Sequence, residues 1–325
     1  LFRPVAMQER VPDRTETKIS IIILTYNRSE LVNKLLSSLV NLEYKPLEII
    51  VVDNASDDDT ENIIRQSFKN TKYIRLPKNI GAGARNQGMK EATGDIIVTL
   101  DDDIFGICGD DLRKISKFFL ARPMLGALNF KIIDHKTNEV CNWVHHRPVA
   151  AYIEKEFLTY EITEGAVAFR RKALLEAGYY PEIFFLSHEG PDLALRILDA
   201  GYDVVYSSVV TVRHLHSNLG RVSWLNYYYD TRNQFWLAAR NFPLGYSLVY
   251  LGRGLSGMLF FAIRDGHFMM YFKGIIDAFV GLKEILRERK KLSPNTMVII
   301  KQINKSRTTL LSLLKDGVLL RKVRL

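Results

Sequence analysis

Four short apolar segments near the start of the sequence constrain the fold more than any other feature. They are Ile19–Leu24, Glu48–Val52, Tyr73–Leu76 and Ile96–Leu100, and segments with helical spacing of leucine and isoleucine separate them. Short runs that are apolar on both faces are typical of strands buried in a parallel sheet. Strands that alternate with helices in this way are joined by right-handed crossovers. We therefore predict an α/β fold with a mostly parallel central sheet.

Three consecutive carboxylates, Asp101, Asp102 and Asp103, follow the fourth apolar segment directly. In an open α/β sheet the carboxyl end of a strand faces the ligand crevice. Three adjacent negative charges repel one another unless a cation lies among them. Because hard divalent ions prefer oxygen ligands, Mn²⁺ or Mg²⁺ is the natural candidate. The alternative interpretation is an acidic turn exposed to solvent.

A glycine-rich turn spans residues 79–88. Gly81 and Gly83 fit the first two positions of a dinucleotide-binding fingerprint, but Asn86 occupies the third position, so we exclude that motif. The turn either presents backbone N–H groups to a phosphate at a helix N-terminus or serves tight packing. Arg85 is the side chain expected to meet an anion there.

Four motifs, in order over about eighty residues, resemble the successive signatures of family 2 glycosyltransferases. They are Thr25-Tyr26-Asn27-Arg28, Val52-Asp53-Asn54-Ala55-Ser56-Asp57-Asp58, Asn79-Ile80-Gly81 with Ala84-Arg85-Asn86, and Leu100-Asp101-Asp102-Asp103. The resemblance implies a GT-A (nucleotide-diphospho-sugar transferase) fold over residues 18–240, after an N-terminal extension of residues 1–17. Residues 18–105 would form the nucleotide-sugar half and residues 106–240 the acceptor half. It also implies inverting transfer of a sugar from a nucleotide-diphosphate sugar, with Mn²⁺ or Mg²⁺ as cofactor.

The resemblance also implies roles for individual residues. Asp53 would accept a hydrogen bond from the base. Since a carboxylate accepts well from the imide N–H of uracil or thymine, a UDP- or dTDP-linked donor is favoured. Asp103 would reach the metal, which neutralises the leaving diphosphate. The residues implied to contact the nucleotide sugar are Thr25, Tyr26, Asn27, Arg28, Asp53, Asn54, Gly81, Arg85, Asp101 and Asp102.

The second half of the sequence contains the candidate general base. Residues 163–171 resemble the strand and loop before the acceptor site of the family, and residues 187–196 resemble its catalytic loop. Many relatives carry Glu-Asp-x-Asp-Leu in this loop, with the second acid as the usual base, whereas this chain has Gly190 there. Glu189, expected in the loop before a helix, is therefore the first candidate for the base. Asp192 is the second, although a carboxylate at a helix start suits a structural role.

Two histidines, His214 and His216, follow the apolar segment Val204–Val212, which predicts a further strand. Lone histidines are usually structural. Relatives often place a metal-ligating histidine after this strand, so the resemblance implies His214 as a metal ligand, with His216 as the alternative.

Residues 241–325 form a predicted helical region that is apolar, aromatic and basic. Charged residues interrupt the apolar stretch between Leu244 and Leu286, so we expect no membrane-spanning helix, which needs about 20 apolar residues. We expect amphipathic helices on a membrane surface, beside the basic residues 287–291. A soluble helical subdomain or a homo-oligomer interface is the alternative. The net charge of +9 arises almost entirely from Lys283 to the end of the sequence, and we predict that this basic segment meets anionic membrane rather than nucleic acid.

Several expectations concern partners and location. The segment Tyr227–Trp236 resembles rhamnosyltransferase-like members of the family, which implies a lipid-linked or growing surface glycan as acceptor. Arg232 in that segment is a candidate for a phosphate or lipid head group, with helix packing as the alternative. Two cysteines and a polar first segment predict a cytoplasmic protein at the inner face of the cell membrane. A binding scaffold without activity and a nucleotidyltransferase are the competing functions.

Overall fold

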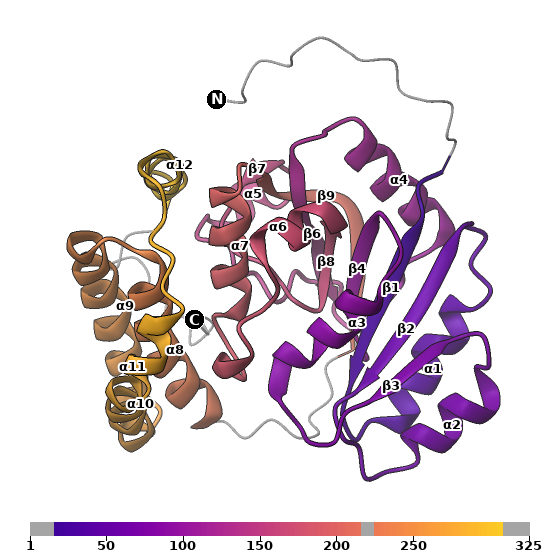
Figure 1. Ribbon diagram of the computed structural model, residues 1–325, viewed down its shortest axis with the longest axis horizontal. Helices are drawn as coiled ribbons and strands as arrows, with labels where there is room; N and C mark the ends of the chain where they lie inside the picture. The colour runs from indigo at the N-terminus through magenta and orange to yellow at the C-terminus, as the bar shows by residue number, and fades with distance from the viewer. Residues whose placement is uncertain (1–15, 216–223, 308–325) are drawn as a thin grey trace.

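The structure is a computed structural model that describes residues 16–215 and 224–307. Its first half follows the predicted alternation of strands and helices, with two sides visible in Figure 1: an α/β part and a group of C-terminal helices. The elements of this half are β1 (Ile19–Thr25), α1 (Ser29–Leu39), β2 (Leu47–Asp53), α2 (Thr60–Ser67), β3 (Lys72–Arg75), η1 (Gly81–Ala84), α3 (Arg85–Glu91) and β4 (Ile96–Asp101).

The central sheet is mostly parallel, which confirms the predicted fold class. Among the described residues nine strands form one sheet in the order β3-β2-β1-β4-β8-β6-β9-β5, and β7 also pairs with β9. The strands from β3 to β4 are parallel, whereas β8 runs antiparallel to both β4 and β6. The remaining strands are β5 (Ile104–Phe105), β6 (Leu125–Asp134), β7 (Phe157–Leu158), β8 (Ala166–Arg170) and β9 (Asp203–His214).

Helices cover both faces of the sheet, because the side chains of each strand alternate between two apolar clusters. In β1, Ile22 belongs to one cluster, while Ile21 and Ile23 belong to the other. The first cluster lies under α3, α6 and α7, and the second under α1 and α4. The helices not yet given are α4 (Gly109–Leu120), α5 (Val149–Tyr152), α6 (Arg171–Ala177), η2 (Glu182–Phe184) and α7 (Glu189–Asp199).

Five helices follow the sheet: α8 (Trp224–Asn241), α9 (Leu244–Arg264), α10 (Phe268–Val280), α11 (Leu282–Arg287) and α12 (Pro294–Asn304). Helix α8 packs against α9, α10 and α11, and it also contacts α7, so it connects the helical group to the sheet. The expectation that no segment reaches membrane-spanning length was wrong. Within the described chain, α9 has 21 residues, interrupted by Arg253 alone before Arg264, and is long and apolar enough to cross a membrane.

Candidate active site

The register of the parallel strands brings three sequence motifs to one edge of the sheet. Thr25 at the end of β1 lies beside Asp53 at the end of β2, and Leu24 lies beside Asp101 at the end of β4. The side chains that follow these three strands therefore meet at the carboxyl edge, as expected for an α/β ligand site.

Arg28 lies between the second and third carboxylates of the acidic triplet. Its Nη1 donates to Oδ1 of Asp102 and to Oδ2 of Asp103, both at 2.9 Å. The hydroxyl of Thr25 donates to the other oxygen of Asp102 at 2.8 Å. Burial raises the pKa of Asp102 to about 6, although Arg28 acts against this shift. Asp102 and Asp103 are thus a buried, partly neutralised pair rather than part of a solvated turn.

Strand β9 brings His214 to the same cluster. Ile104 of β5 pairs with His214, and Nε2 of the histidine lies 3.3 Å from Oδ1 of Asp103. The side chain of Asn142 lies 3.0 Å from the other ring nitrogen, Nδ1, and fixes the ring orientation. His216 lies outside the described residues.

The donor set at this point fits a divalent ion only in part. Asp103 and His214 face each other with an oxygen and an imidazole nitrogen, both of which are ligands for Mn²⁺. The described part of the chain contains no group of three or more His, Cys, Asp and Glu side chains placed to hold a metal. A bound ion would therefore need further ligands from the diphosphate of the donor.

The predicted nucleotide pocket contains one exposed and two buried side chains. Tyr26 is 42% exposed beside Asn27, which has a φ of +52°. Asp53 is fully buried and accepts hydrogen bonds from the backbone of Ser56 and from the hydroxyl of Tyr73. Asn54 contacts Asn79 and the backbone of residues 80 and 81, so it fixes the glycine-rich turn against β2.

The glycine-rich turn packs tightly against the loop that leads to α7. Gly81 has a φ of +71°, and a Cβ at this position would lie 1.9 Å from the carbonyl oxygen of Phe185. The N–H of Ala82 donates to that same oxygen at 2.7 Å, so it is not offered to a phosphate. Arg85 is buried, pairs with Asp101, and its Nε has no hydrogen-bond partner among the described residues.

The loop between η2 and α7 is held in a strained conformation. Phe185, Ser187 and His188 have φ values of +64°, +71° and +64°, which side chains other than glycine rarely adopt. Asn233 of α8 donates to the carbonyl oxygens of residues 184, 186 and 187, and Arg232 donates to that of residue 184. Arg232 is buried against Trp236, so packing, rather than a phosphate or lipid contact, is its role here.

Glu189 is the first residue of α7 rather than a loop residue, which corrects the expected position. It is 3% exposed, and its Oε2 has no hydrogen-bond partner in the described chain. Burial raises the pKa of Glu189 well above the usual glutamate range, and the neighbouring Glu164 raises it further. Glu164 lies in the segment that resembles the strand and loop before the acceptor site, but nothing in the sequence singles it out; only the fold brings it to α7.

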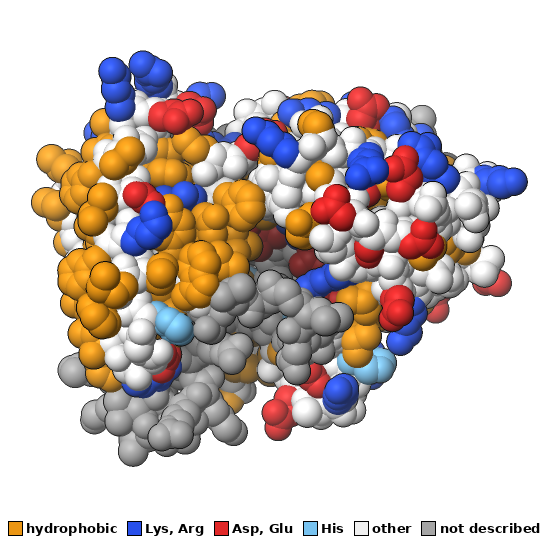
Figure 2. Space-filling model, turned by 90° about the horizontal axis from the view of Figure 1, so that it is seen from below, with side chains coloured by type: hydrophobic (Ala, Val, Ile, Leu, Met, Phe, Trp, Pro, Cys, Tyr) orange, Lys and Arg blue, Asp and Glu red, His pale blue; other side chains and the backbone are white. Residues whose placement is uncertain are grey.

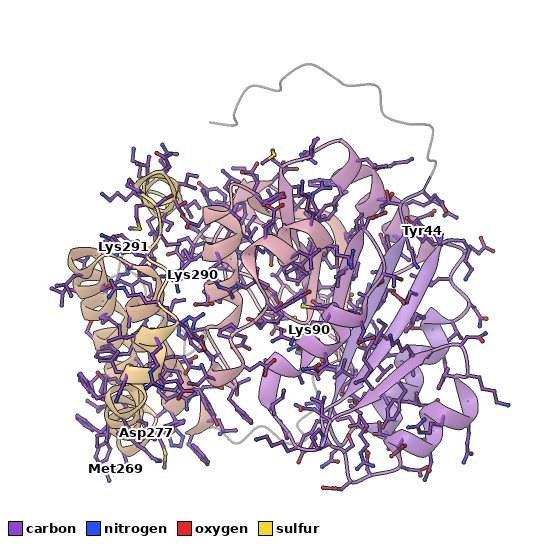
Figure 3. All side chains as sticks on the ribbon, in the orientation of Figure 1. Tyr44, Lys90, Met269, Asp277, Lys290 and Lys291 are labelled. Carbon is purple, nitrogen blue, oxygen red and sulfur yellow. The ribbon has the colours of Figure 1, made fainter. Side chains whose placement is uncertain are left out.

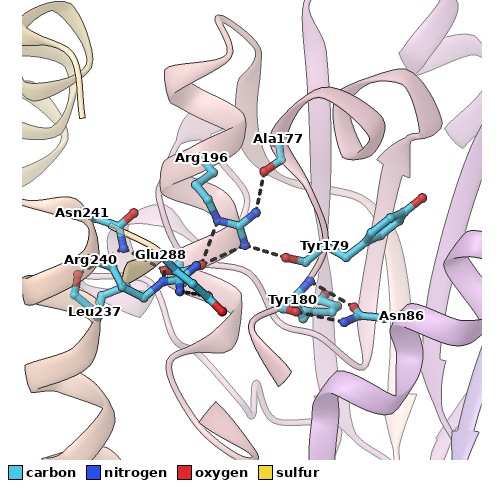
Figure 4. A network of polar contacts seen from close by, with 10 residues as sticks. Asn86, Ala177, Tyr179, Tyr180, Arg196, Leu237, Arg240, Asn241 and Glu288 are labelled. Carbon is cyan, nitrogen blue, oxygen red and sulfur yellow. Dashed lines mark hydrogen bonds and ion pairs between the residues drawn. The ribbon is translucent and has the colours of Figure 1, made fainter. Parts of the chain in front are cut away.

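Asp192 lies one turn further along α7 and is fully buried. Figure 4 shows Arg196, Arg240 and Asn241 of the polar network around it. Its carboxylate accepts hydrogen bonds from Arg196 at 2.9 Å, Arg240 at 3.0 Å and Asn241 at 2.8 Å. Burial opposes ionisation, but the two arginines outweigh it and lower the pKa of Asp192. This carboxylate is therefore a weak base held between α7 and α8.

A mostly parallel sheet with acids at its carboxyl edge, followed by a C-terminal helical region, is a GT-A-like α/β fold. The family model of glycosyl transferase family 2 matches residues 20–176, so this chain carries a family 2 glycosyltransferase domain.

Known proteins agree with this assignment. The chain is 28% identical to the O-antigen chain rhamnosyltransferase RfbN of Salmonella typhimurium over 65% of this chain and 70% of that protein. It is 37% identical to a GalNAc(5)-diNAcBac-PP-undecaprenol beta-1,3-glucosyltransferase of Campylobacter jejuni, over 26% of this chain and 29% of the relative. The second alignment thus spans well under two thirds of the relative's length.

Solved structures share the fold at low sequence identity. S. aureus TarS 1–349 superposes with a TM-score of 0.59 at 18% identity, covering 93% of this chain and 87% of that one. The mannosyltransferase PcManGT of Pyrobaculum calidifontis, solved with GDP-Man and Mn²⁺, superposes with a TM-score of 0.51 at 21% identity, covering 95% and 81%.

Proposed function

We propose that this protein transfers a sugar, with inversion and with a divalent metal, from a nucleoside-diphosphate sugar to a glycan or lipid-linked glycan. One observation carries the proposal: three consecutive acids, a histidine and a buried glutamate lie at the carboxyl edge of the sheet. They are Asp101 at the end of β4, Asp102 and Asp103 directly after it, His214 at the end of β9, and Glu189 at the start of α7. One carboxylate oxygen of Glu189, Oε2, has no hydrogen-bond partner among the described residues.

The donor would lie along the edge formed by β1, β2 and β4. Exposed Tyr26 would stack on the base, and Asp53, already oriented by Ser56 and Tyr73, would accept its imide N–H. Asn54 and Gly81 position the turn that borders this pocket. We favour a UDP- or dTDP-linked donor on this ground. Solved neighbours of this fold contain UDP, UDP-GlcNAc and GDP-Man, so the fold accommodates more than one base.

Asp103 and His214 would hold the metal, Mn²⁺ or Mg²⁺, with His216 as the alternative ligand. A metal bound there would stabilise the charge that develops on the departing diphosphate. Arg28 would move from its two carboxylates toward that diphosphate, and Arg85 keeps Asp101 oriented toward the sugar.

Glu189 would act as the general base. It accepts the proton of the acceptor hydroxyl while that oxygen forms a bond to the anomeric carbon. The bond from the anomeric carbon to the diphosphate breaks, and the nucleoside diphosphate leaves with the electron pair. Attack from the face opposite the leaving group inverts the configuration. Asp192 is the second candidate, which we place behind Glu189 because two arginines neutralise it.

The acceptor is proposed from the C-terminal helices and from the relatives. Apolar side chains gather over these helices in Figure 2, and the exposed ones on α9 and α10 include Leu244, Leu248, Val249, Met269, Phe272, Ile276, Phe279 and Val280. Lys290 and Lys291 lie on the same side of the molecule as α10 (Figure 3). A surface that combines apolar helices with lysine fits an anionic membrane. Two relatives agree with a lipid-linked acceptor by their names: a GalNAc(5)-diNAcBac-PP-undecaprenol beta-1,3-glucosyltransferase and an O-antigen chain rhamnosyltransferase.

Nucleotide binding tests the donor site. We expect one of UDP, dTDP, GDP and CMP, together with Mn²⁺, to raise the melting temperature by about 5 °C at saturating concentration, because a ligand that binds only the folded state stabilises it. Asp103→Ala should abolish the metal-dependent part of this rise. Asp110→Ala removes an exposed acid of α4 and serves as the control, which should keep the metal-dependent rise in melting temperature. If none of the four nucleotides stabilises the wild type, the donor site is wrong.

Vesicle binding tests the membrane proposal. We expect the protein to co-sediment with vesicles that contain anionic lipid, and the pair Phe272→Asp and Ile276→Asp to weaken this binding at least about tenfold. Both side chains are more than half exposed, so the melting temperature should not change. Leu175→Asp, at an exposed leucine of α6, is the matched control. A wild-type protein that stays in the supernatant would refute the membrane role. So would a double variant that still binds vesicles but no longer forms a dimer.

A further inference from the structure

The backbone of α7 leaves room for a carboxyl group that comes from another part of the chain. A Cβ added to Gly190 would lie 2.2 Å from Oε1 of Glu164 and 2.6 Å from the carbonyl oxygen of Ile162. Any side chain at residue 190 would therefore displace Glu164. The glycine next to Glu189 is thus what allows the Glu164 carboxyl to reach the first turn of α7.

The segment that carries Glu164 is fixed to β4. The hydroxyl of Thr99 donates to the carbonyl oxygen of Glu164 at 2.6 Å, and the N–H of Asp101 donates to that of Gly165 at 3.1 Å. At the other end, the N–H of Gly190 donates to the Glu164 carboxylate. Glu164 therefore spans from the acidic strand end to the start of α7, where Glu189 begins the helix.

The environment of the two glutamates holds too little positive charge to offset two ionised carboxyl groups. Arg85 is the cation that faces them, and it already pairs with Asp101. Burial raises the pKa of Glu164 as well as that of Glu189, and Asp101 adds to the shift of Glu164. The titratable groups that face the pair in the described structure are Arg85 of α3, Asp101 of β4, Tyr180 before η2 and Asp230 of α8.

We propose that Glu164 is the partner carboxyl of Glu189: its negative charge, which Gly190 admits to the first turn of α7, makes Glu189 a stronger proton acceptor than an isolated glutamate. The inference rests on the proposed function, in which Glu189 takes the proton of the acceptor hydroxyl. Before the reaction both carboxyl groups are ionised. Glu189 then takes the proton of the acceptor hydroxyl, and that proton returns to water when the products leave. Because Glu164 acts through Glu189, it is a positioning residue.

The pH dependence of kcat/KM tests the pair. Glu164→Gln keeps the shape of the side chain and removes its charge, so we expect the acid-side pKa of the profile to fall by roughly one unit. Glu164→Asp should keep the acid-side pKa near that of the wild type. Glu161→Gln, a buried glutamate of the same segment that pairs with His146, is the matched control and should leave the profile unmoved. An unchanged acid-side pKa in Glu164→Gln would overturn the proposal. Loss of activity at every pH, as in Glu189→Gln, would overturn the division of roles.

The pH dependence of stability tests the same pair without catalysis, and so separates its failure from that of the proposed function. A carboxyl whose pKa is raised by folding binds more protons in the folded state, so stability falls as pH rises above the ordinary glutamate pKa of about 4.5. We expect the melting temperature of the wild type to fall more between pH 5 and about pH 8 than that of Glu164→Gln. Equal slopes would show that the pair is not coupled, whether or not the protein transfers sugar.

Discussion

Glu189→Gln is expected to lower kcat for sugar transfer by about 10²- to 10⁴-fold, the usual contribution of a general base. The amide keeps the size of the side chain but cannot accept a proton. Since Glu189 is not among the residues proposed to contact the nucleotide, nucleotide binding should be retained. The measurement is steady-state transfer with a saturating nucleotide sugar, together with the thermal shift produced by the nucleotide and Mn²⁺.

Glu182→Gln is the matched control for this variant. Glu182 lies on the same approach to α7, in η2, but its side chain is exposed, and we expect near wild-type turnover. Retention of more than a tenth of the wild-type kcat in Glu189→Gln would remove Glu189 from the role of base. Loss of nucleotide binding as well as turnover would point to a structural defect. If the wild-type protein binds the nucleotide but never transfers a sugar, the protein is a binding scaffold without activity.

The sequence was sufficient to predict the first four strands of the sheet and the contents of their carboxyl edge. Apolar runs such as Ile19–Leu24 specify buried parallel strands, and a parallel sheet brings all its carboxyl ends together, so the Asp triplet and Thr25 were placed correctly by topology. The antiparallel β8 was not predicted as such. Its sequence, residues 166–170, is as apolar as that of a parallel strand, and direction depends on the loops before it.

Contacts between distant segments set the limits of prediction at the site. Glu164 and Glu189 are 25 positions apart, and their approach depends on Gly190. In the sequence alone, Gly190 only stands where many relatives have an acid. Arg232 illustrates the same limit. Its place in an aromatic segment suggested an anion, whereas the carbonyl oxygens of the strained loop before α7 take its N–H groups. The length of α9 was not predicted, because Arg253 and Arg264 interrupt the apolar stretch in the sequence. The helix nevertheless continues for 21 residues.

Asp192→Asn is expected to destabilise the protein by about 3–5 kcal/mol, the usual cost of removing one partner from a buried ion pair. Arg196 and Arg240 are 11% and 9% exposed, so both would keep a charge that water does not reach. Arg240 retains Glu288, and Arg196 retains two backbone carbonyl oxygens, which places the loss toward the lower end of this range. Urea unfolding with an unchanged m-value would measure it.

The control for Asp192→Asn is Asp199→Asn at the exposed end of α7, where the carboxylate accepts hydrogen bonds from Ser293 and Thr296 and its loss should cost about 1 kcal/mol. Turnover of the folded variant at low temperature then separates the two candidate bases. If Asp192 holds α7 against α8 and Glu189 takes the proton, folded Asp192→Asn keeps kcat within about tenfold of the wild type. A stable, folded Asp192→Asn without activity would instead make Asp192 the base, and it would show that its two arginines leave during turnover.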